Sequence, residues 1–389
     1  MKHNIAAERM RDIQPFHVMA LLAEARQREA AGQDIIHLEV GEPDFPTPSP
    51  IVEAGIRALQ AGQTKYTAAR GLPQLHEAIA GYYASRFGVK VSAERILVTP
   101  GASGALQLAL GSLLNPGDEV LMTDPGYPCN RHFVRMFEGK AVTIPVGADT
   151  NYQLTPEHVR QYWNDATKAV LLASPANPTG TLLSVNALKA IHATVKQLGG
   201  ILLVDEIYQG LVYGQASETA LSVGSEDIWV INSFSKYFGM TGWRLGWVVV
   251  PEQMVDTLDR LAQNIFLAAP TPAQYAALAA FTPEALDIME RQRQELQRRR
   301  DFLLPALSGL GFTVRTQPRG AFYIYAGSER FGNDAQRLCQ DMLDRTGVVF
   351  TPGLDFGSHQ AETHVRFAYT TSVGRLEQAV ERLARNLLH

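Results

Sequence analysis

The chain has 389 residues, of which 46% are hydrophobic and 19% charged, and its formal net charge is −4. This size and composition suit two domains, or one large one, with an extensive core. The slightly acidic balance gives no electrostatic footprint for nucleic acid. No uninterrupted apolar run could span a bilayer, and the N-terminus lacks the apolar core of a signal peptide.

Cysteine and histidine usage gives no sign of a metal site. Cys129 and Cys339 lie far apart in the sequence and lack metal-ligand spacing, which suits a reducing cytosol. The ten histidines form no His-Glu-x-x-His or similar grouping. We therefore expect a cytoplasmic protein without a metal, a nucleic-acid partner or a membrane partner.

Hydrophobic spacing predicts an alternating pattern of elements from the N-terminus. Helical spacing over residues 16–31 closes at Gly32 and is followed by a strand over 34–40. From about residue 50 to 280, apolar strands alternate with helical stretches. The expected strands are 96–99, 119–122, 141–144, 169–172, 201–204, 228–232 and 245–250. This α/β alternation is typical of a mostly parallel, seven-stranded sheet covered by helices on both faces.

The remaining third of the chain has a mixed pattern. It predicts a long charged helix over 283–307, short strands at 313–315, 321–325 and 365–368, and helices over 334–345 and 373–388. Such a mixture suits a smaller α+β domain completed by the N-terminal segment. We expect an N-terminal arm and part of the small domain over 1–48, a large domain over 49–285, and the C-terminal small domain over 286–389.

Small residues follow the first of the seven strands and open a helix. The segment 96–106 reads Ile-Leu-Val-Thr-Pro-Gly-Ala-Ser-Gly-Ala-Leu, so Gly101, Ala102 and Ser103 lie at a helix N-terminus. Unpaired N–H groups and partial positive charge make such a terminus a phosphate site. A lone glycine-rich turn is a weak signal, and this one is neither a P-loop nor a dinucleotide fingerprint.

Two further strand ends carry polar side chains. Asn177 follows the strand 169–172 in the turn Ser-Pro-Ala-Asn-Pro-Thr-Gly, where prolines hold the backbone on either side. Asp205 ends the next apolar strand, and Tyr208 follows it. Ligands bind at the carboxyl ends of strands in open α/β sheets. Taken alone, Asn177 could be an ordinary turn residue and Asp205 a helix cap.

Lys236 is the most informative position. It lies in the segment 233–246, among hydroxyls and glycines, with Ser233 before it and Arg244 after it. A deprotonated lysine amine condenses with a carbonyl compound to form a Schiff base. Pyridoxal 5'-phosphate is a carbonyl compound with a phosphate, and it also needs a carboxylate near its pyridine nitrogen. Asp205 can supply that carboxylate.

These segments together resemble the class I/II aminotransferases, the fold-type I pyridoxal-phosphate enzymes of the aspartate aminotransferase superfamily. The resemblance runs from the Gly-Glu-Pro-Asp-Phe segment at 41–45 to Arg366 near the C-terminus, over nearly the whole chain. The order along the chain also agrees with that family. It is the phosphate turn, then Tyr127, Asn177, Asp205, Tyr208, Lys236, Arg244 and Arg366.

The resemblance implies a role for each matching residue. Lys236 would form the Schiff base and shuttle the proton, with Asp205 and Tyr208 as the other catalytic residues. Cofactor-binding residues would be Gly101, Ala102, Ser103, Tyr127, Asn177, Asp205, Tyr208, Ser233, Lys236 and Arg244, with Tyr66 reaching the neighbouring subunit's phosphate in a homodimer. Substrate-binding residues would be Gly41, Asn177, Arg366 and Phe16.

Three of these residues have common structural alternatives. Tyr127 could be an aromatic side chain fixed in a proline-rich turn, and Arg366 a solvated residue of an edge strand. Phe16 could equally act as a hydrophobic staple for the first helix. The family resemblance favours ring stacking for Tyr127 and a bidentate clamp on the substrate α-carboxylate for Arg366.

The expected reaction is exchange of an amino group between an L-amino acid and a 2-oxo acid, by a ping-pong mechanism through aldimine and pyridoxamine forms. The nearest alternative is a fold-type I carbon–sulfur β-lyase, which begins with the same chemistry. A remoter alternative is a non-catalytic effector-binding module of aminotransferase type, which we do not expect because the chain retains every position that the resemblance marks as catalytic. The sequence does not identify the preferred donor or acceptor.

Overall fold

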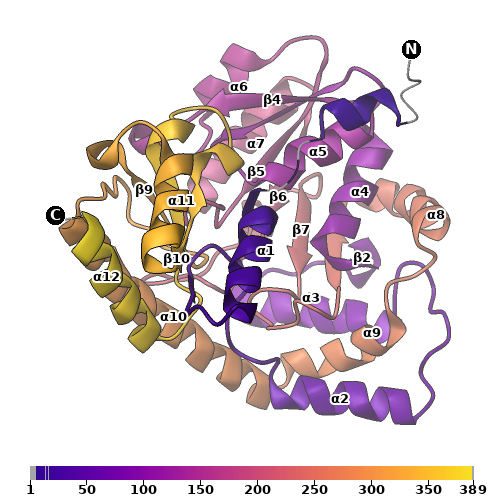
Figure 1. The fold of residues 1–389 in the computed structure, drawn as a ribbon. Coiled ribbons are helices and arrows are strands. Elements are labelled where there is room, and N and C mark those ends of the chain that lie inside the picture. The colour runs from indigo at the N-terminus through magenta and orange to yellow at the C-terminus, as the bar shows by residue number, and fades with distance from the viewer. Residues whose placement is uncertain (1–5, 14, 16, 388–389) are drawn as a thin grey trace.

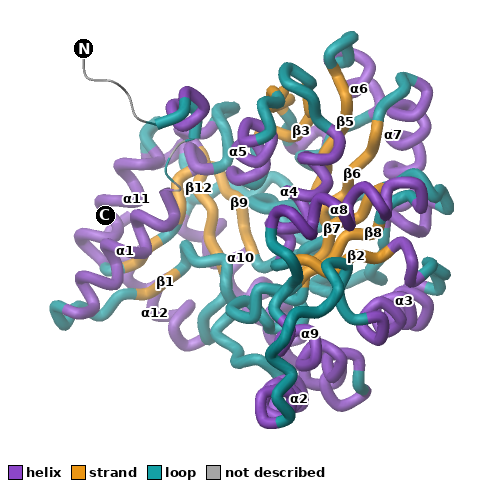
Figure 2. The backbone as a smooth tube through the Cα atoms, turned by 90° about the vertical axis from the view of Figure 1, so that its right-hand side faces the viewer, coloured by secondary structure: helices purple, strands orange, loops and turns teal. Residues whose placement is uncertain are grey.

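The structure is a computed structural model that describes residues 6–13, 15 and 17–387. Its centre is a seven-stranded sheet of order β2-β8-β7-β6-β5-β3-β4 (Figures 1 and 2). Strand β8 is antiparallel to both of its neighbours, and all other pairs are parallel. The strands are β2 (Ile96–Thr99), β3 (Glu119–Asp124), β4 (Lys140–Pro145), β5 (Thr167–Ala173), β6 (Ile201–Asp205), β7 (Trp229–Ser233) and β8 (Gly246–Val249). The predicted mostly parallel, seven-stranded α/β fold is therefore confirmed.

Helices cover both faces of this sheet because its strands are apolar on both sides. In β2, Leu97 packs with the core that includes helices α4 and α8, whereas Ile96 and Val98 face the core that includes α3 and α7. The helices are α1 (His17–Ala30), α2 (Ser49–Gln60), α3 (Pro73–Phe87), α4 (Gly101–Leu113), α5 (Pro128–Met136), α6 (Pro156–Tyr162), α7 (Val185–Gln197), α8 (Val255–Ile265), α9 (Thr271–Leu278), α10 (Pro283–Leu310), α11 (Ala335–Thr346) and α12 (Val373–Leu387).

The long charged helix was predicted over 283–307 and runs as α10 to Leu310. It begins at Thr282, whose hydroxyl accepts a hydrogen bond from the Ala285 N–H, and ends at Gly311, which has a φ of +104°. Only glycine adopts such a φ readily, so this residue ends the helix in a left-handed cap. Thr282 and Gly311 therefore define both ends of the longest helix among the described residues.

The C-terminal part and the N-terminal segment form two smaller sheets. A three-stranded antiparallel sheet has the order β11-β12-β9, and β1 pairs in parallel with β10. Figure 2 shows β9, β12 and β1 beside the seven-stranded sheet. The strands are β1 (Ile36–His37), β9 (Tyr323–Gly327), β10 (Val348–Val349), β11 (Thr351–Pro352) and β12 (His364–Ala368). The pairing of β1 with β10 supports the proposal that the N-terminal segment belongs with the smaller domain.

Three strand predictions in this region need correction. The strand expected over 34–40 is only Ile36–His37, since the chain after Leu38 leaves the ladder and enters the cavity described below. Residues 313–315 contribute a single bridge from Thr313 to Gly327 instead of a strand. The strand expected over 321–325 begins two residues later, at Tyr323.

Among the described residues, no helix is both long and apolar enough to cross a membrane.

Candidate active site

The carboxyl ends of the parallel strands surround a cavity of about 410 Å³. Asp205 is the last residue of β6, Asn177 follows β5, and Lys236 follows β7. The size of the cavity and its place at the strand ends are those of a small-molecule site. The lining residues are Val18, Met19, Leu22, Arg26, Val40, Gly41, Glu42, Ala102, Ser103, Leu106, Tyr127, Ala173, Asn177, Asp205, Ile207, Tyr208, Ser235, Lys236, Thr241, Arg244, Tyr323 and Arg366.

The Lys236 side chain points from the loop after β7 toward the N-terminal segment. Its Nζ donates a hydrogen bond to the Gly41 carbonyl oxygen at 2.7 Å. Burial lowers the pKa of Lys236 to about 8, and the positive charges of Arg366 and Arg244 act in the same direction, against Glu42. The amine is therefore a nucleophile near neutral pH, as Schiff-base chemistry requires.

Asp205 presents a carboxylate to the same cavity, and no described residue forms an ion pair with it. The side chain is 4% exposed, and the one hydrogen bond recorded to its carboxylate, from the described residues, is the Ile207 N–H at 3.0 Å. Burial raises the pKa of Asp205 to about 6, because ionisation is costly away from water. A cationic group of a ligand at this position would stabilise the ionised carboxylate.

The N-terminus of α4 and Arg244 form an anion-binding corner. No side chain of the part of the chain that the structure describes caps this helix, and Ala102 and Ser103 in its first turn line the cavity. A Cβ atom on Gly101 would lie 2.7 Å from Arg244 Nη2, so the guanidinium approaches the helix start closely only because residue 101 is glycine. Arg244 Nη1 is held by the Thr241 carbonyl oxygen at 3.0 Å. Backbone donors and a fixed cation suit a phosphate group.

Two serines lie shortly before Lys236. Ser233, which was predicted to contact the phosphate, is 1% exposed, and its hydroxyl lies within hydrogen-bond distance of Ser235 Oγ at 2.9 Å and of the Leu245 carbonyl oxygen at 3.1 Å, so its phosphate contact stays a prediction. Ser235 is the serine that lines the cavity. Sequence reasoning overlooked Ser235, although its position immediately before the lysine could have suggested it.

Arg366 is held flat and buried on β12. Its Nη1 donates to Asn177 Oδ1 at 2.9 Å and its Nη2 to the Glu39 carbonyl at 2.6 Å. The guanidinium carbon lies 4.2 Å from the Tyr323 ring centroid and 4.7 Å from that of Phe356. The predicted edge-strand alternative for Arg366 does not hold, because the residue is 2% exposed. A fixed planar guanidinium facing a cavity is suited to binding a carboxylate.

The other predicted residues occupy different places. Tyr127 lines the cavity, and its burial together with neighbouring Cys129 raises the pKa of its hydroxyl well above the usual value. Tyr66 is 81% exposed and does not line this cavity. Phe16 lies outside the described residues. The cavity therefore gathers most, but not all, of the predicted residues.

Tyr323 was not predicted as a site residue, yet it joins three of those that were. Its hydroxyl oxygen lies 2.8 Å from the Tyr208 hydroxyl oxygen, and its ring packs against the Arg366 guanidinium. A Cβ atom on Gly41 would lie only 2.2 Å from the Tyr323 hydroxyl, so glycine is needed there. The sequence pattern predicted Tyr323 only as part of a short strand over 321–325, because its contacts are with segments far apart in the chain.

The profile of the family described as "Aminotransferase class I and II" matches residues 33–383. The chain belongs to this family. Valine–pyruvate aminotransferase of Mycobacterium tuberculosis is 36% identical to this aminotransferase, over 95% of this chain and 96% of the relative. The (5-formylfuran-3-yl)methyl phosphate transaminase of Methanocaldococcus jannaschii is 35% identical, over 97% and 98%.

Solved structures agree with the sequence relatives. The crystal structure of an aminotransferase from Mycobacterium tuberculosis has a TM-score of 0.95 at 35% identity and covers 99% of both chains. Aspartate aminotransferase from Thermus thermophilus with maleate has a TM-score of 0.92 at 33% identity and covers 98% of this chain and 99% of its own. This chain is therefore a transaminase with the fold of aspartate aminotransferase.

Replacing Tyr323 with phenylalanine should weaken catalysis without unfolding the protein. The variant keeps the ring against Arg366 but removes the hydrogen bond to Tyr208, which is worth about 1 kcal/mol or about fivefold in rate. We expect kcat to fall by about that factor. If the enzyme binds pyridoxal 5'-phosphate as the resemblance implies, the pH at which its visible absorbance changes should also shift. An unchanged titration would show that Tyr323 serves packing alone.

Proposed function

We propose that this transaminase carries pyridoxal 5'-phosphate on Lys236 and uses it to exchange amino groups between L-amino acids and 2-oxo acids. The single observation that supports this most is the juxtaposition in one cavity of an amine with a pKa of about 8, an unpaired buried carboxylate and an anion-binding corner. Those three features match the aldehyde, the pyridine nitrogen and the phosphate of the cofactor.

The residues present fit the cofactor in detail. Asp205 would hold a proton on the pyridine nitrogen, and Tyr127 would lie against the ring. Tyr208 and the amide group of Asn177 would donate to the phenolic oxygen, while the start of α4, Ser235 and Arg244 would hold the phosphate. When bound, the cofactor supplies an electron sink for the electron pair that remains on the substrate α-carbon after its proton is removed.

The chain's own groups would then position substrate and move protons. Arg366 would bind the α-carboxylate bidentately, with Asn177 and the main chain near Glu39 keeping its plane fixed. The Lys236 amine, near the Gly41 carbonyl, would take the proton from the substrate α-carbon and return it to the C4' atom of the cofactor. Asp205 and Arg366 are buried and Lys236 is half-buried, so little water would reach these groups and their charge interactions would be strengthened.

We further propose a cytoplasmic homodimer with shared sites. Tyr66 is 81% exposed in the loop between α2 and α3, which suits a residue that completes the phosphate site of a second subunit. Helix α2, which precedes this loop, exposes the apolar side chains of Ile56 and Leu59, and a second subunit could cover them. Two free cysteines suit a reducing compartment.

The function is tested by following both products of the reaction. Purified enzyme with added cofactor, an amino-acid donor and a 2-oxo acid should form one new amino acid for each 2-oxo acid consumed. A carbon–sulfur β-lyase would instead release ammonia and pyruvate from the amino acid alone. Ammonia release without amino transfer to any of a panel of 2-oxo acids would reject the proposed function in favour of that alternative.

The depressed pKa of Lys236 predicts a distinct pH dependence for cofactor uptake. The reactive form is the neutral amine, so the rate at which cofactor-free enzyme gains visible absorbance should rise about tenfold per pH unit below about 8 and then level off. A stopped-flow pH series measures this. Uptake that keeps rising up to pH 10.5 would mean that the amine has an ordinary lysine pKa.

The same shift has a consequence for the stability of the cofactor-free protein. The folded lysine loses its proton near pH 8, whereas the unfolded one keeps it up to about 10.5. The unfolded state therefore binds more protons in that window, and the contribution of Lys236 to stability rises with pH across it. The free energy of unfolding by urea should be measured against pH for the cofactor-free wild type and for Lys236→Met. The difference between the two curves isolates this contribution.

A further inference from the structure

A buried carboxylate joins the end of β3 to residues 355–359, which connect β11 and β12 and are called here the anchored loop. Asp124 ends β3 and is 3% exposed. Its carboxylate accepts hydrogen bonds from the Ser358 N–H at 3.0 Å, the Ser358 hydroxyl at 2.9 Å and the His359 N–H at 3.2 Å, and no described residue forms an ion pair with it. A buried charge that depends on these donors binds them strongly, so Asp124 fixes the loop in place.

The anchored loop comes this close to β3 only because residue 357 is glycine. A Cβ atom on Gly357 would lie 1.8 Å from Asp124 Oδ1, which leaves no room for a side chain. A main-chain bond crosses the same junction, since the Gly126 N–H donates to the Phe356 carbonyl oxygen at 2.8 Å. Gly126 directly precedes Tyr127, which lines the cavity. The turn after β3 and the anchored loop are therefore joined through both side-chain and main-chain atoms.

Phe356 connects this junction to the arginine of the cavity. Its side chain is 1% exposed, and its ring centroid lies 4.7 Å from the guanidinium carbon of Arg366. The Tyr323 ring also packs against that guanidinium, with its centroid at 4.2 Å. The attraction between a cation and an aromatic ring depends on their separation and orientation. A shift of the anchored loop would therefore remove one of the two rings that keep the guanidinium plane fixed.

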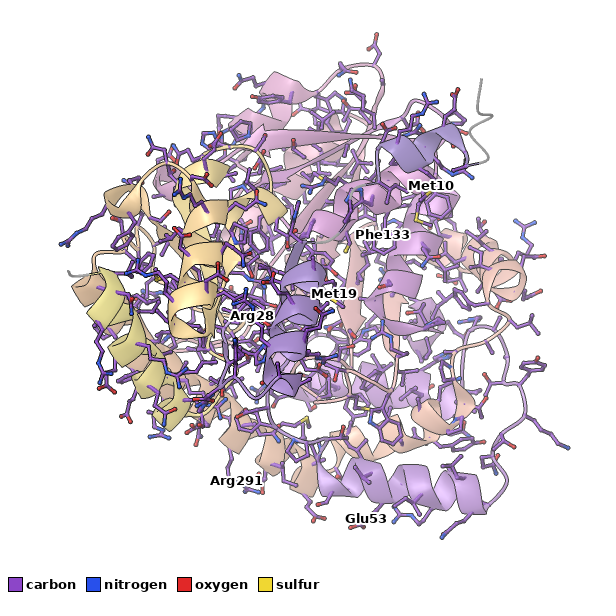
Figure 3. All side chains as sticks on the ribbon, in the orientation of Figure 1. Met10, Met19, Arg28, Glu53, Phe133 and Arg291 are labelled. Atoms are coloured by element: carbon purple, nitrogen blue, oxygen red, sulfur yellow. The ribbon has the colours of Figure 1, made fainter. Side chains whose placement is uncertain are left out.

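The anchored loop also caps the helix that forms one wall of the cavity. The Asp355 carboxylate accepts the His17 N–H at 3.0 Å and the Val18 N–H at 3.4 Å, at the N-terminus of α1. A carboxylate at this end of a helix is stabilising. The next residue of α1, Met19, lines the cavity and is labelled in Figure 3. Displacement of the loop would thus disturb the cavity on two sides.

We propose that Asp124 is a positioning residue for binding of the substrate α-carboxylate, and that it acts through Phe356 on Arg366. The inference rests on the proposed function, in which Arg366 binds that carboxylate. Asp124 does not itself belong to the described residues that line the cavity, so its effect on substrate is indirect. The start of α4 and Arg244, which would hold the cofactor phosphate, take no part in these contacts. Loss of the anchor should therefore weaken substrate binding and leave cofactor binding intact.

The test is Asp124→Asn in enzyme with added cofactor, because the amide keeps the shape of the carboxylate but removes its charge and one acceptor. The KM for the amino donor should rise by about 10- to 100-fold, as expected for lost charge-assisted hydrogen bonds. The kcat should change by less than about threefold, because the carboxylate is bound alike in the ground state and the transition state. The Kd of butyrate, an unreactive carboxylate, should rise with the KM, whereas the cofactor Kd should not change.

Two further variants complete the test. Ser358→Ala removes one of the three donors at an exposed residue, so it should fold and raise the KM by about threefold. Asp149→Asn removes a carboxylate charge from an exposed residue after β4 and should change neither KM nor Kd.

The separation of substrate from cofactor binding decides between positioning and a general structural role. An unchanged KM in Asp124→Asn and Ser358→Ala would overturn the proposal. So would a cofactor affinity that falls by the same factor as the butyrate affinity, because that result indicates general loosening of the fold. If Asp124→Asn does not fold, Ser358→Ala gives the same decision from its KM and its cofactor Kd. Failure of the proposed function looks different, because the wild type would then transfer no amino group to any 2-oxo acid.

Discussion

Lys236→Ala should lower kcat by at least about 10⁴-fold, since one substitution would remove both the covalent attachment and the acid–base group that we propose for this residue. The structure gives the reason in physical terms. The Lys236 amine is the only one that lines the cavity among the described residues, and its pKa of about 8 makes it reactive near neutral pH. Steady-state kinetics with a saturating donor and acceptor measure the loss.

A matched control separates this effect from that of replacing a lysine elsewhere in the chain. Lys189 is an exposed lysine on α7, so Lys189→Ala should keep wild-type activity. In Lys236→Ala the visible absorbance of the lysine-bound cofactor should also disappear, while the melting temperature of the cofactor-free protein stays equal or rises because a buried amine is removed. Turnover close to wild type, or a borohydride-trapped adduct on another lysine, would refute the role of Lys236.

The positions of the site residues at the strand ends could be predicted because the pattern that indicates them lies within a few neighbouring residues. Asp205 ends a run of four apolar residues, and Gly101 opens a helix directly after an apolar strand, so the chain itself places both at the carboxyl edge of a parallel sheet. The roles of these residues came from the family resemblance. The structure adds what local sequence cannot give, namely that Lys236 reaches Gly41 and Arg366 reaches Asn177 across the molecule.

The incorrect strand bounds over 34–40 and the failure to predict Tyr323 as a site residue share a physical cause. The segment 34–40 has strand composition, but only Ile36 and His37 pair with β10, since the following residues must turn so that Gly41 can approach Tyr323. Tyr323 itself has the pattern of a buried strand residue, and its contact with Tyr208 spans 115 positions of sequence. Tertiary contacts of this kind override local propensity and leave no periodic signal.

Asp205→Asn should have the second-largest effect, lowering kcat by about 10²- to 10³-fold while leaving the cofactor bound. An amide has nearly the shape of the carboxylate but no charge, so it cannot hold the pyridine nitrogen in its protonated form, and the electron sink is weakened. The proposed attachment to Lys236 and the proposed phosphate site at Gly101 and Arg244 should be unaffected. Kinetics combined with a cofactor-binding titration therefore separate this variant from Lys236→Ala.

Stability supplies an independent check on Asp205. Burial raises its pKa from the ordinary 3.8 to about 6 in the cofactor-free fold, so the folded state binds more protons than the unfolded state between those values. The contribution of Asp205 to stability thus falls as pH rises through that window and remains unfavourable at neutral pH. Cofactor-free Asp205→Asn should then be at least as stable as wild type at pH 7. A variant that is much less stable at pH 7 would show that the carboxylate is needed to hold the fold together, and that its charge is not reserved for a ligand.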